Sequence, residues 1–332
     1  MKTRFLVTAA AVAALSTLAQ AQDSLLNASY DVSRELYKAI NPAFSKQYKE
    51  QHGKDVEVKQ THGGSSKQAR AVIEGLEADV VTFNTSSDIN ALVEAGKVSP
   101  EWKSKFPHNA SPYTSISAFI VRKGNPKNIN DWDDLIRDDV KIALVNPKTG
   151  GNGRYTFLAA YGYALKKFNG DQEKAKQFLN KLYQNVPVLD TGGRAATTTF
   201  AQRGIGDVLV TFEAEVKLIA EEFGADKVEI VVPSVSVEAE FPVATVDPVT
   251  AKRGTADLAK AYLEYLFTEP AQEIIASLYY RPQSPEVAKK YADQFVQTDL
   301  VNVKEVFGGS DKTKAFFVDG GLFDEIYALH KK

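Results

Sequence analysis

The sequence of 332 residues has no cysteine, one methionine and two tryptophans. Without cysteine it forms no disulfide, so its stability must come from a core of apolar side chains. A hydrophobic content of 44% is enough for such a core, and a chain of this length most simply divides it between two lobes. Beyond the first 21 residues, no stretch approaches the roughly 20 apolar residues that a membrane helix needs.

An excess of positive charge is also lacking. The chain has 40 Lys and Arg residues against 42 Asp and Glu residues, a net charge of −2. A groove for nucleic acid needs clustered basic residues, so we expect no nucleic-acid partner. If the ligand is an anion, local hydrogen-bond donors must attract it, because the overall charge of the protein does not.

The first 21 residues have the order of a secretion signal. Lys2 and Arg4 precede an apolar stretch at 5–18, and Ala19-Gln20-Ala21 forms an Ala-x-Ala cleavage box. The apolar stretch is too short and too rich in alanine to span a bilayer comfortably. We therefore expect a signal peptide at 1–21 that is cleaved after Ala21, and an exported chain that begins at residue 22.

The rest of the chain alternates between short apolar runs and amphipathic stretches, a pattern that predicts an α/β fold with mostly parallel sheets. The expected strands lie at 56–61, 79–84, 117–123, 141–146, 186–191, 207–213, 228–233 and 241–247. The expected helices lie at 33–51, 66–76, 171–184, 214–223, 255–267 and 284–295.

Three of the strand-to-helix junctions contain a pair of glycines. These pairs are Gly63-Gly64, Gly150-Gly151 and Gly192-Gly193. Such a turn presents backbone N–H groups in one direction, beside the positive end of the helix dipole, and this arrangement binds anions. The Gly-Lys-Ser/Thr ending of a nucleotide loop is missing. One glycine turn often serves only the backbone, but three that meet at the carboxyl ends of strands favour an anion pocket.

Arg154 and Arg194 each follow a glycine pair, in the first turn of the next helix. A cation at this position opposes the helix dipole, at a cost of roughly 0.3–1 kcal/mol unless it is offset. One interpretation is an ion pair with Asp31, Asp190 or another carboxylate. The other is compensation of the charge of a bound dianion, and the two are compatible.

Several segments resemble the periplasmic sulfate- and thiosulfate-binding proteins of ABC importers. They are LLNASYDVSRELY (25–37), HGGSSKQ (62–68), RKGNPKNINDWDDL (122–135), NPKTGGNGRY (146–155), RGIGDVLVTFEAE (203–215), YYRPQSPEVAKKY (279–291) and EVFGG (305–309). The resemblance covers nearly the whole chain after the signal peptide, in order. It implies a type II-like, two-lobed α/β binding protein in the periplasm, with helices flanking the sheets and the anion in the cleft between the lobes. We place the first lobe at 22–112 plus 247–332 and the second at 113–246.

The resemblance also implies which residues surround the anion. Asp31, Ser65, Gly150, Gly151, Asn152, Gly193 and Phe212 fall at its ligand-binding positions, with Arg154, Arg194 and Thr149 in the surrounding layer. Ser65 would donate from its hydroxyl, and the residues at 150–152 and 193 from backbone N–H groups. The family has no cofactor, no metal and no catalytic residue, and it delivers its ligand to a membrane permease. We expect this chain to do the same as a monomer.

Two positions depart from the sulfate-binding pattern. Sulfate binders have serine at the position of Gly150 and tryptophan at that of Phe212, and each donates a side-chain hydrogen bond. Phenylalanine at 212 resembles the thiosulfate-binding branch, although that branch usually keeps the serine. The sequence therefore leaves the choice between sulfate and thiosulfate open.

A hydrolase of anionic esters is an alternative from another class. A sulfatase needs a Cys/Ser-x-Pro-x-Arg motif, which the sequence lacks, and its four histidines are too scattered for a zinc site. His62 beside Gly63 has the chemistry of a general base, but a packed or capping histidine is the better interpretation. We expect no catalysis.

Other ligands of the same fold are a second alternative. Ferric iron is held partly by adjacent tyrosines in related binding proteins, and Tyr279-Tyr280 is such a pair. Because Arg281-Pro282 follows within a segment that resembles the sulfate family, we interpret the tyrosines as packing residues. Molybdate and phosphate remain possible oxyanion ligands.

Overall fold

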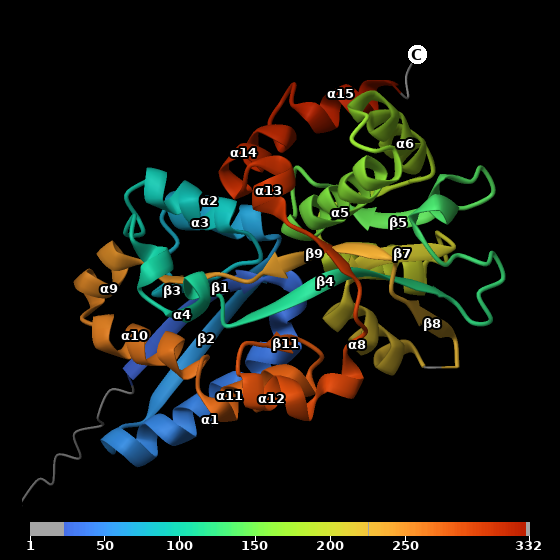
Figure 1. Cartoon of the computed structure of the whole chain (residues 1–332). Coiled ribbons are helices and arrows are strands. Elements are labelled where there is room, and N and C mark those ends of the chain that lie inside the picture. Colours follow the sequence, from blue (N-terminus) through green and yellow to red (C-terminus); the bar gives the residue numbers. More distant parts are fainter. Residues whose placement is uncertain (1–22, 225, 330–332) are drawn as a thin grey trace, which may run out of the picture.

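Two β-sheets organise the chain, each at the centre of one lobe (Figure 1). The computed structural model describes residues 23–224 and 226–329. The expected signal peptide and its cleavage site lie outside these residues. Within them, no helix is long and apolar enough to cross a membrane.

The first sheet has four strands in the order β10-β3-β1-β2. Strand β1 runs parallel to both β2 and β3. The strands are β1 (Asp23–Tyr30), β2 (Val56–Gly63), β3 (Val80–Thr82) and β10 (Val243–Thr245). The helices of this lobe are α1 (Arg34–His52), α2 (Ser65–Ile73), α3 (Ser86–Glu94), α4 (Pro107–Ala110), α9 (Asp247–Arg253), α10 (Ala256–Tyr265), α11 (Glu269–Ser277) and α12 (Pro285–Lys290).

The second sheet has the order β12-β9-β4-β7-β5-β6, and β8 and β11 also pair with β4. Its strands are β4 (Tyr113–Arg122), β5 (Ile142–Val145), β6 (Leu189–Asp190), β7 (Val208–Phe212), β8 (Val228–Val231), β9 (Val235–Glu240), β11 (Arg281–Pro282) and β12 (Asp299–Val301). Its helices are α5 (Gly151–Lys167), α6 (Gln172–Gln184), α7 (Gly193–Thr197), the π-helix η4 (Thr198–Gln202), α8 (Glu213–Phe223), α13 (Val303–Phe307), α14 (Ser310–Lys314) and α15 (Leu322–Ala328).

Strands β4 and β9 connect the two lobes. Tyr113, at the start of β4, belongs to the core of the first lobe, whereas Phe119 in the same strand belongs to the core of the second. Each antiparallel pair in the described residues involves β4 or β10. The remaining pairs are parallel, as the alternation of strands and helices predicted. The predicted α/β class is confirmed.

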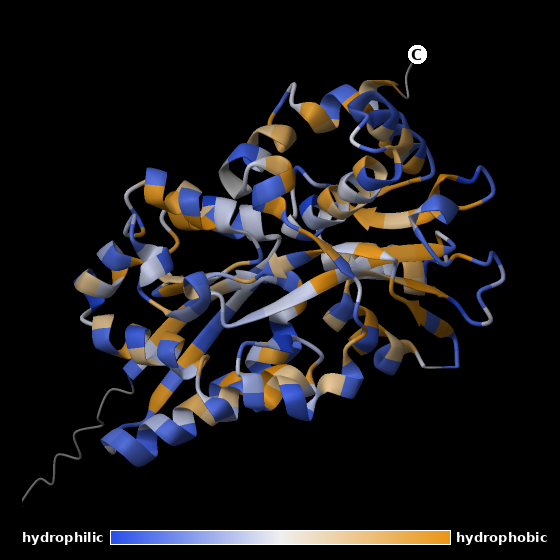
Figure 2. Cartoon of the chain, viewed as in Figure 1, coloured by the Kyte–Doolittle hydropathy of each residue, from blue (hydrophilic) through white to orange (hydrophobic). Residues whose placement is uncertain are grey.

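Strand β1 was not predicted because its buried face is partly polar. Asn27 and Ser29 are fully buried, and both bond to the hydroxyl of Thr82 in β3, at 3.1 and 2.7 Å. A pattern of apolar residues does not detect a strand whose buried positions are satisfied by hydrogen bonds. Strands β9, β11 and β12 were not predicted either. Apolar strands such as β5 and β7 (Figure 2) were found.

The structure differs from the expected lobe boundaries in two segments. Residues 243–245, assigned to the second lobe, form β10 and pair with β3 in the first sheet. Residues 299–329, assigned to the first lobe, join the second: β12 pairs with β9, and Phe307, Phe317 and Phe323 enter the second core. Local sequence patterns show that a segment is a helix or strand, but not which sheet it packs on.

Candidate functional site

The three glycine junctions meet where the lobes face each other. A Cβ atom at Gly64, in the first lobe, would lie 3.1 Å from the carbonyl oxygen of Thr149 and 3.4 Å from that of Thr191. Thr149 precedes α5 and Thr191 precedes α7, both in the second lobe. The starts of α2, α5 and α7 therefore converge on one point between the lobes.

Glycine is required at these junctions by close packing. None of the six glycines in the three pairs has a positive φ, so the left-handed region is not the reason for them. A Cβ at Gly151 would lie 2.1 Å from Oδ1 of Asn84, and one at Gly193 would lie 2.6 Å from Cγ1 of Val32. Asn84 and Val32 belong to the opposite lobe. A side chain at either glycine would hold the lobes apart.

The three helices leave backbone donors at this meeting point. The N–H groups in the first turn of a helix have no acceptor within the helix. The residues before α2, α5 and α7 are Gly64, Gly150 and Gly192, and none of them makes a side-chain cap. The N–H groups of Gly151, Asn152 and Gly193 lie in these first turns, beside the positive ends of the helix dipoles.

Ser65 and Asp31 complete this group from the first lobe. Ser65 begins α2, is buried, and its Oγ accepts the N–H of Asn84 at 3.5 Å. Asp31 follows β1, and its Oδ2 accepts the N–H of Arg194 from the second lobe at 3.3 Å. Burial raises the pKa of the Asp31 carboxyl, and hydrogen bonds from backbone N–H groups partly oppose that shift. The structure thus brings the expected binding residues together, and their contact with an anion stays a prediction.

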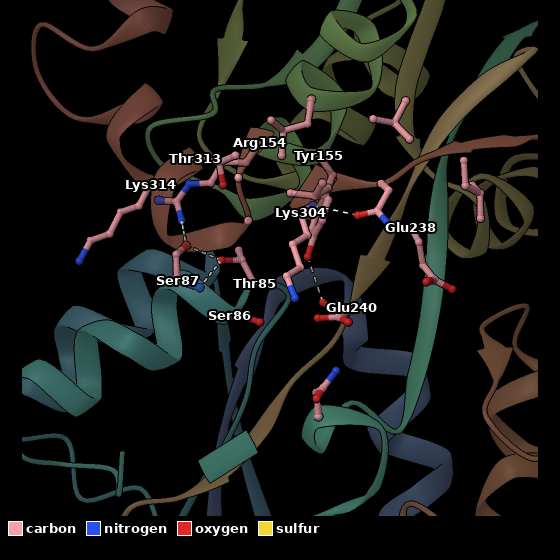
Figure 3. Close-up of a pocket in the computed structure, with 18 of the residues that line it drawn as sticks. Thr85, Ser86, Ser87, Arg154, Tyr155, Glu238, Glu240, Lys304, Thr313 and Lys314 are labelled. Atoms are coloured by element: carbon pink, nitrogen blue, oxygen red, sulfur yellow. Dashed lines mark hydrogen bonds between the residues drawn. The ribbon is translucent and has the colours of Figure 1, made fainter. Parts of the chain in front are cut away.

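Arg154 bridges the two lobes. Its guanidinium donates to the hydroxyl of Ser87 at 2.8 Å (Figure 3). It also donates to the hydroxyl of Ser66 at 3.0 Å and lies 3.3 Å from Oδ1 of Asp88. Its Nε also donates to the carbonyl of Pro147 at 3.0 Å, in its own lobe. The carboxylate partner that the sequence analysis expected is therefore Asp88, which is buried.

Arg194 has a different role from Arg154. Its guanidinium makes two bonds to Glu222 in the same lobe, at 3.0 and 3.1 Å, and both side chains are exposed. Its side-chain partner is thus neither Asp31 nor Asp190. Asp190 accepts a hydrogen bond from Thr199 at 3.1 Å.

Gly150 has little room for the serine that the family carries. A Cβ at Gly150 would lie 2.7 Å from Cγ1 of Val145, a stiff and fully buried side chain of β5. Thr149, just before it, directs its own hydroxyl to the carbonyl of Asn146 at 3.2 Å. In this chain, the glycine at 150 therefore accompanies a bulky Val145.

The Phe212 side chain is buried where the two lobes meet. It ends β7 in the second sheet, yet it packs in the core of the first lobe. Its ring contacts Phe241 edge-on, with centroids 5.1 Å apart, and Tyr155 at 6.0 Å. A phenyl ring needs no hydrogen-bond partner in this setting.

The sequence analysis missed Glu215, a buried carboxyl of α8. Its oxygens meet the hydroxyls of Thr211 and Thr197, the latter at 3.2 Å, and the side-chain N–H of Asn152 at 3.2 Å. A Cβ at Gly193 would lie only 3.0 Å from its Oε1. The sequence could have pointed to Glu215 by its position just after a buried strand, because ligands bind at the carboxyl ends of strands in such sheets.

A cavity of about 710 Å³ lies beside these junctions (Figure 3). It is lined by Arg154 and Tyr155 of α5, Glu238 and Glu240 of β9, and parts of residues 300–317. Of the expected binding residues and their surrounding layer, only Arg154 reaches it.

The tyrosine pair of the iron alternative is packed. Tyr280 is buried, and its hydroxyl lies 3.5 Å from the carbonyl of Val32. Tyr279 donates its hydroxyl to Glu221 at 2.5 Å. Across 23–224 and 226–329, no group of three His, Cys, Asp or Glu side chains is arranged to hold a metal ion.

Glu215 predicts a specific dependence of stability on pH. Burial raises its pKa to about 7, and the nearby Asp31 adds to the shift. Between pH 4.5 and 7 the folded protein keeps a proton that the unfolded chain has released, so stability falls as pH rises. In Glu215→Gln, the free energy of unfolding should therefore fall less between pH 4.5 and 7 than in the parent, by up to about 3 kcal/mol. Urea unfolding of both proteins across this range measures it, and a difference that does not change with pH would contradict it.

Comparison with known proteins agrees with this geometry. The sequence profile of the family described as bacterial extracellular solute-binding proteins matches residues 26–281. A thiosulfate-binding protein of Pseudomonas aeruginosa is 53% identical over 96% of each chain. A sulfate-binding protein of Escherichia coli is 51% identical over 94% of this chain and 95% of its own.

A solved structure shows the same fold. The sulfate-binding protein SubI from Mycobacterium tuberculosis superimposes with a TM-score of 0.80 and 32% identity, over 88% of this chain and 98% of SubI. Its similarity, with that of the two relatives above, extends beyond the fold to the sequence. The chain therefore belongs to the bacterial extracellular solute-binding proteins, in the group of sulfate- and thiosulfate-binding proteins.

Proposed function

We propose that this protein captures sulfate or thiosulfate in the periplasm and presents it to the membrane permease of an ABC importer. It does so as a monomer, without catalysis and without a cofactor. The observation that carries the proposal is the convergence of three helix starts from two lobes, each preceded by a glycine that has no side chain to cap it. The relatives named as sulfate- and thiosulfate-binding proteins support the choice of ligand.

The site suits an anion that brings no proton. The guanidinium groups of Arg154 and Arg194 are already ion-paired, Arg154 with Asp88 and Arg194 with Glu222. The ligand would therefore be held by N–H and O–H donors, which stabilise negative charge where water is excluded. Sulfate and thiosulfate offer only acceptors to such donors at neutral pH.

Export and delivery follow from the same proposal. The order of charged, apolar and Ala-x-Ala segments at 1–21 is that of a cleaved secretion signal, and the family is described as extracellular. A binding protein that closes around its ligand gives a permease a shape that the empty protein lacks.

The first test of the function is calorimetry of the chain from residue 22 with sulfate, thiosulfate, phosphate and molybdate. We expect tight binding of sulfate or thiosulfate, and phosphate weaker by at least about tenfold. The protonated oxygen of phosphate would be buried among donors, which costs roughly 1–3 kcal/mol. The Asp31 carboxylate, which already accepts the N–H of Arg194, is a nearby acceptor that could take that proton. A phosphate affinity within tenfold of the sulfate affinity would contradict the proposed selectivity. If none of the four anions binds, the proposed function is wrong.

The bridge made by Arg154 predicts a difference between the two arginines. Arg154→Ala removes contacts with Ser66, Ser87 and Asp88 across the lobes, so the closed form should lose stability and anion affinity should fall about tenfold or more. Arg194→Ala is the matched control: it removes an exposed pair within one lobe and should change affinity less than about threefold. Titration calorimetry, with small-angle scattering to follow closure, compares them. Equal affinities for the two variants would show that the bridge does not support closure.

Gly150 and Val145 predict how selectivity can be shifted. Gly150→Ser alone should weaken both anions, because its Cβ meets Val145. Combined with Val145→Ala, the serine hydroxyl has room to donate to a sulfate oxygen, whereas the terminal sulfur of thiosulfate accepts poorly. Relative to Val145→Ala alone, the double variant should raise the ratio of sulfate to thiosulfate affinity about tenfold. A ratio within twofold of that control would refute the idea.

A further inference from the structure

Glu215 connects the two anion-facing loops of the second lobe. Its Oε2 accepts the side-chain N–H of Asn152, whose backbone N–H lies in the first turn of α5. Its Oε1 lies 3.2 Å from the hydroxyl of Thr197, which in turn lies 3.1 Å from the carbonyl oxygen of Gly193. The carboxyl therefore lies directly behind the starts of both α5 and α7.

The hydrogen-bond inventory around this carboxyl lacks one donor. A threonine hydroxyl has one proton to donate. The Thr211 hydroxyl accepts from Asn152 at 2.6 Å and can donate to Oε2 of Glu215. The Thr197 hydroxyl faces two acceptors, the Gly193 carbonyl and Oε1 of Glu215, and can satisfy only one. A proton on Oε1 resolves this, because Glu215 then donates to Thr197 and Thr197 donates to Gly193.

The surrounding charges also favour a neutral group. Arg194 is the cation near Glu215, but its guanidinium is paired with Glu222. Asp31 approaches the same helix start from the other lobe, and its carboxyl disfavours a second negative charge. The hydroxyl of Tyr280 completes the titratable neighbours and carries no charge near neutral pH.

Glu213, two residues earlier, is the opposite case. It is also buried, but Nε of Arg281 lies 2.8 Å from its Oε2. The chain therefore supplies a cation to one of two neighbouring buried carboxyls and not to the other. This contrast indicates that Glu215 is buried without needing its charge.

We propose that Glu215 is a positioning residue that works as a neutral acid. It fixes Asn152 and, through Thr197, the start of α7, so that backbone N–H groups of both loops face the ligand. Because it is neutral, it places no negative charge behind donors that must hold a dianion. This role rests on the proposed function, and burial, which raises the pKa of Glu215 to about 7, is consistent with it. A bound dianion would raise that pKa further.

Infrared difference spectroscopy tests the protonation state directly. The parent protein at pH 6, and at pH 7.5 with saturating sulfate or thiosulfate, should show the C=O stretch of a protonated carboxyl that Glu215→Gln lacks. Glu213→Gln is the matched control, and it should keep this band because its own carboxyl is ion-paired. Absence of the band from the anion-bound parent would overturn the proposal.

Calorimetry of the same proteins tests the role in binding. Glutamine has the same shape as the neutral acid and a donor N–H, so Glu215→Gln should bind the anion within about threefold of the parent. Glu215→Ala releases Asn152 and Thr197 and should weaken binding about tenfold. If Glu215→Ala does not fold, the glutamine variant alone decides: a loss of tenfold or more overturns the proposal.

The two proposals fail in different ways. A parent protein that binds neither sulfate nor thiosulfate defeats the proposed function and this role with it. If the parent binds tightly and Glu215→Gln and Glu215→Ala lose the same amount of anion affinity, only the proposed role of Glu215 is wrong.

Discussion

The absence of side chains at Gly64, Gly151 and Gly193 is the constraint on which the closed site depends. At each of these positions a Cβ would press on an atom of the opposite lobe. Only bare backbone lets the helix starts from two lobes approach one point. The bridge made by Arg154 and the burial of Ser65 both follow from that approach.

The Arg154 and Arg194 side chains near the site are ion-paired, so an anion bound as proposed would meet backbone dipoles instead of these cations. Asp88 occupies Arg154, and Glu222 occupies Arg194. An anion held by N–H groups leaves without breaking a direct ion pair, which suits a protein that must both bind its cargo and release it. A negative charge behind the N–H donors would repel an anion, and a neutral Glu215 avoids this repulsion.

Apolar strands and glycine junctions made the α/β class and the convergence of loops predictable from the sequence. The polar strand β1 was not, because the hydrogen bonds of Asn27 and Ser29 are invisible until β3 is placed beside it. The partner of Arg154 was also out of reach: Asp88 is distant in sequence, and only the docking of the lobes brings it near. Glu215 was hidden for a related reason, since its partners lie on α5, α7 and β7.

The return of residues 299–329 to the second lobe has a consequence for how the chain acquires its structure. The edge strand β12 and the rings of Phe307, Phe317 and Phe323 complete a core whose other strands are made much earlier. The first lobe likewise waits for β10 and for α10 and α11. Neither lobe is a continuous stretch of chain, so neither core is complete until segments far apart in the sequence have come together. Contacts of such long sequence separation slow the folding of both lobes.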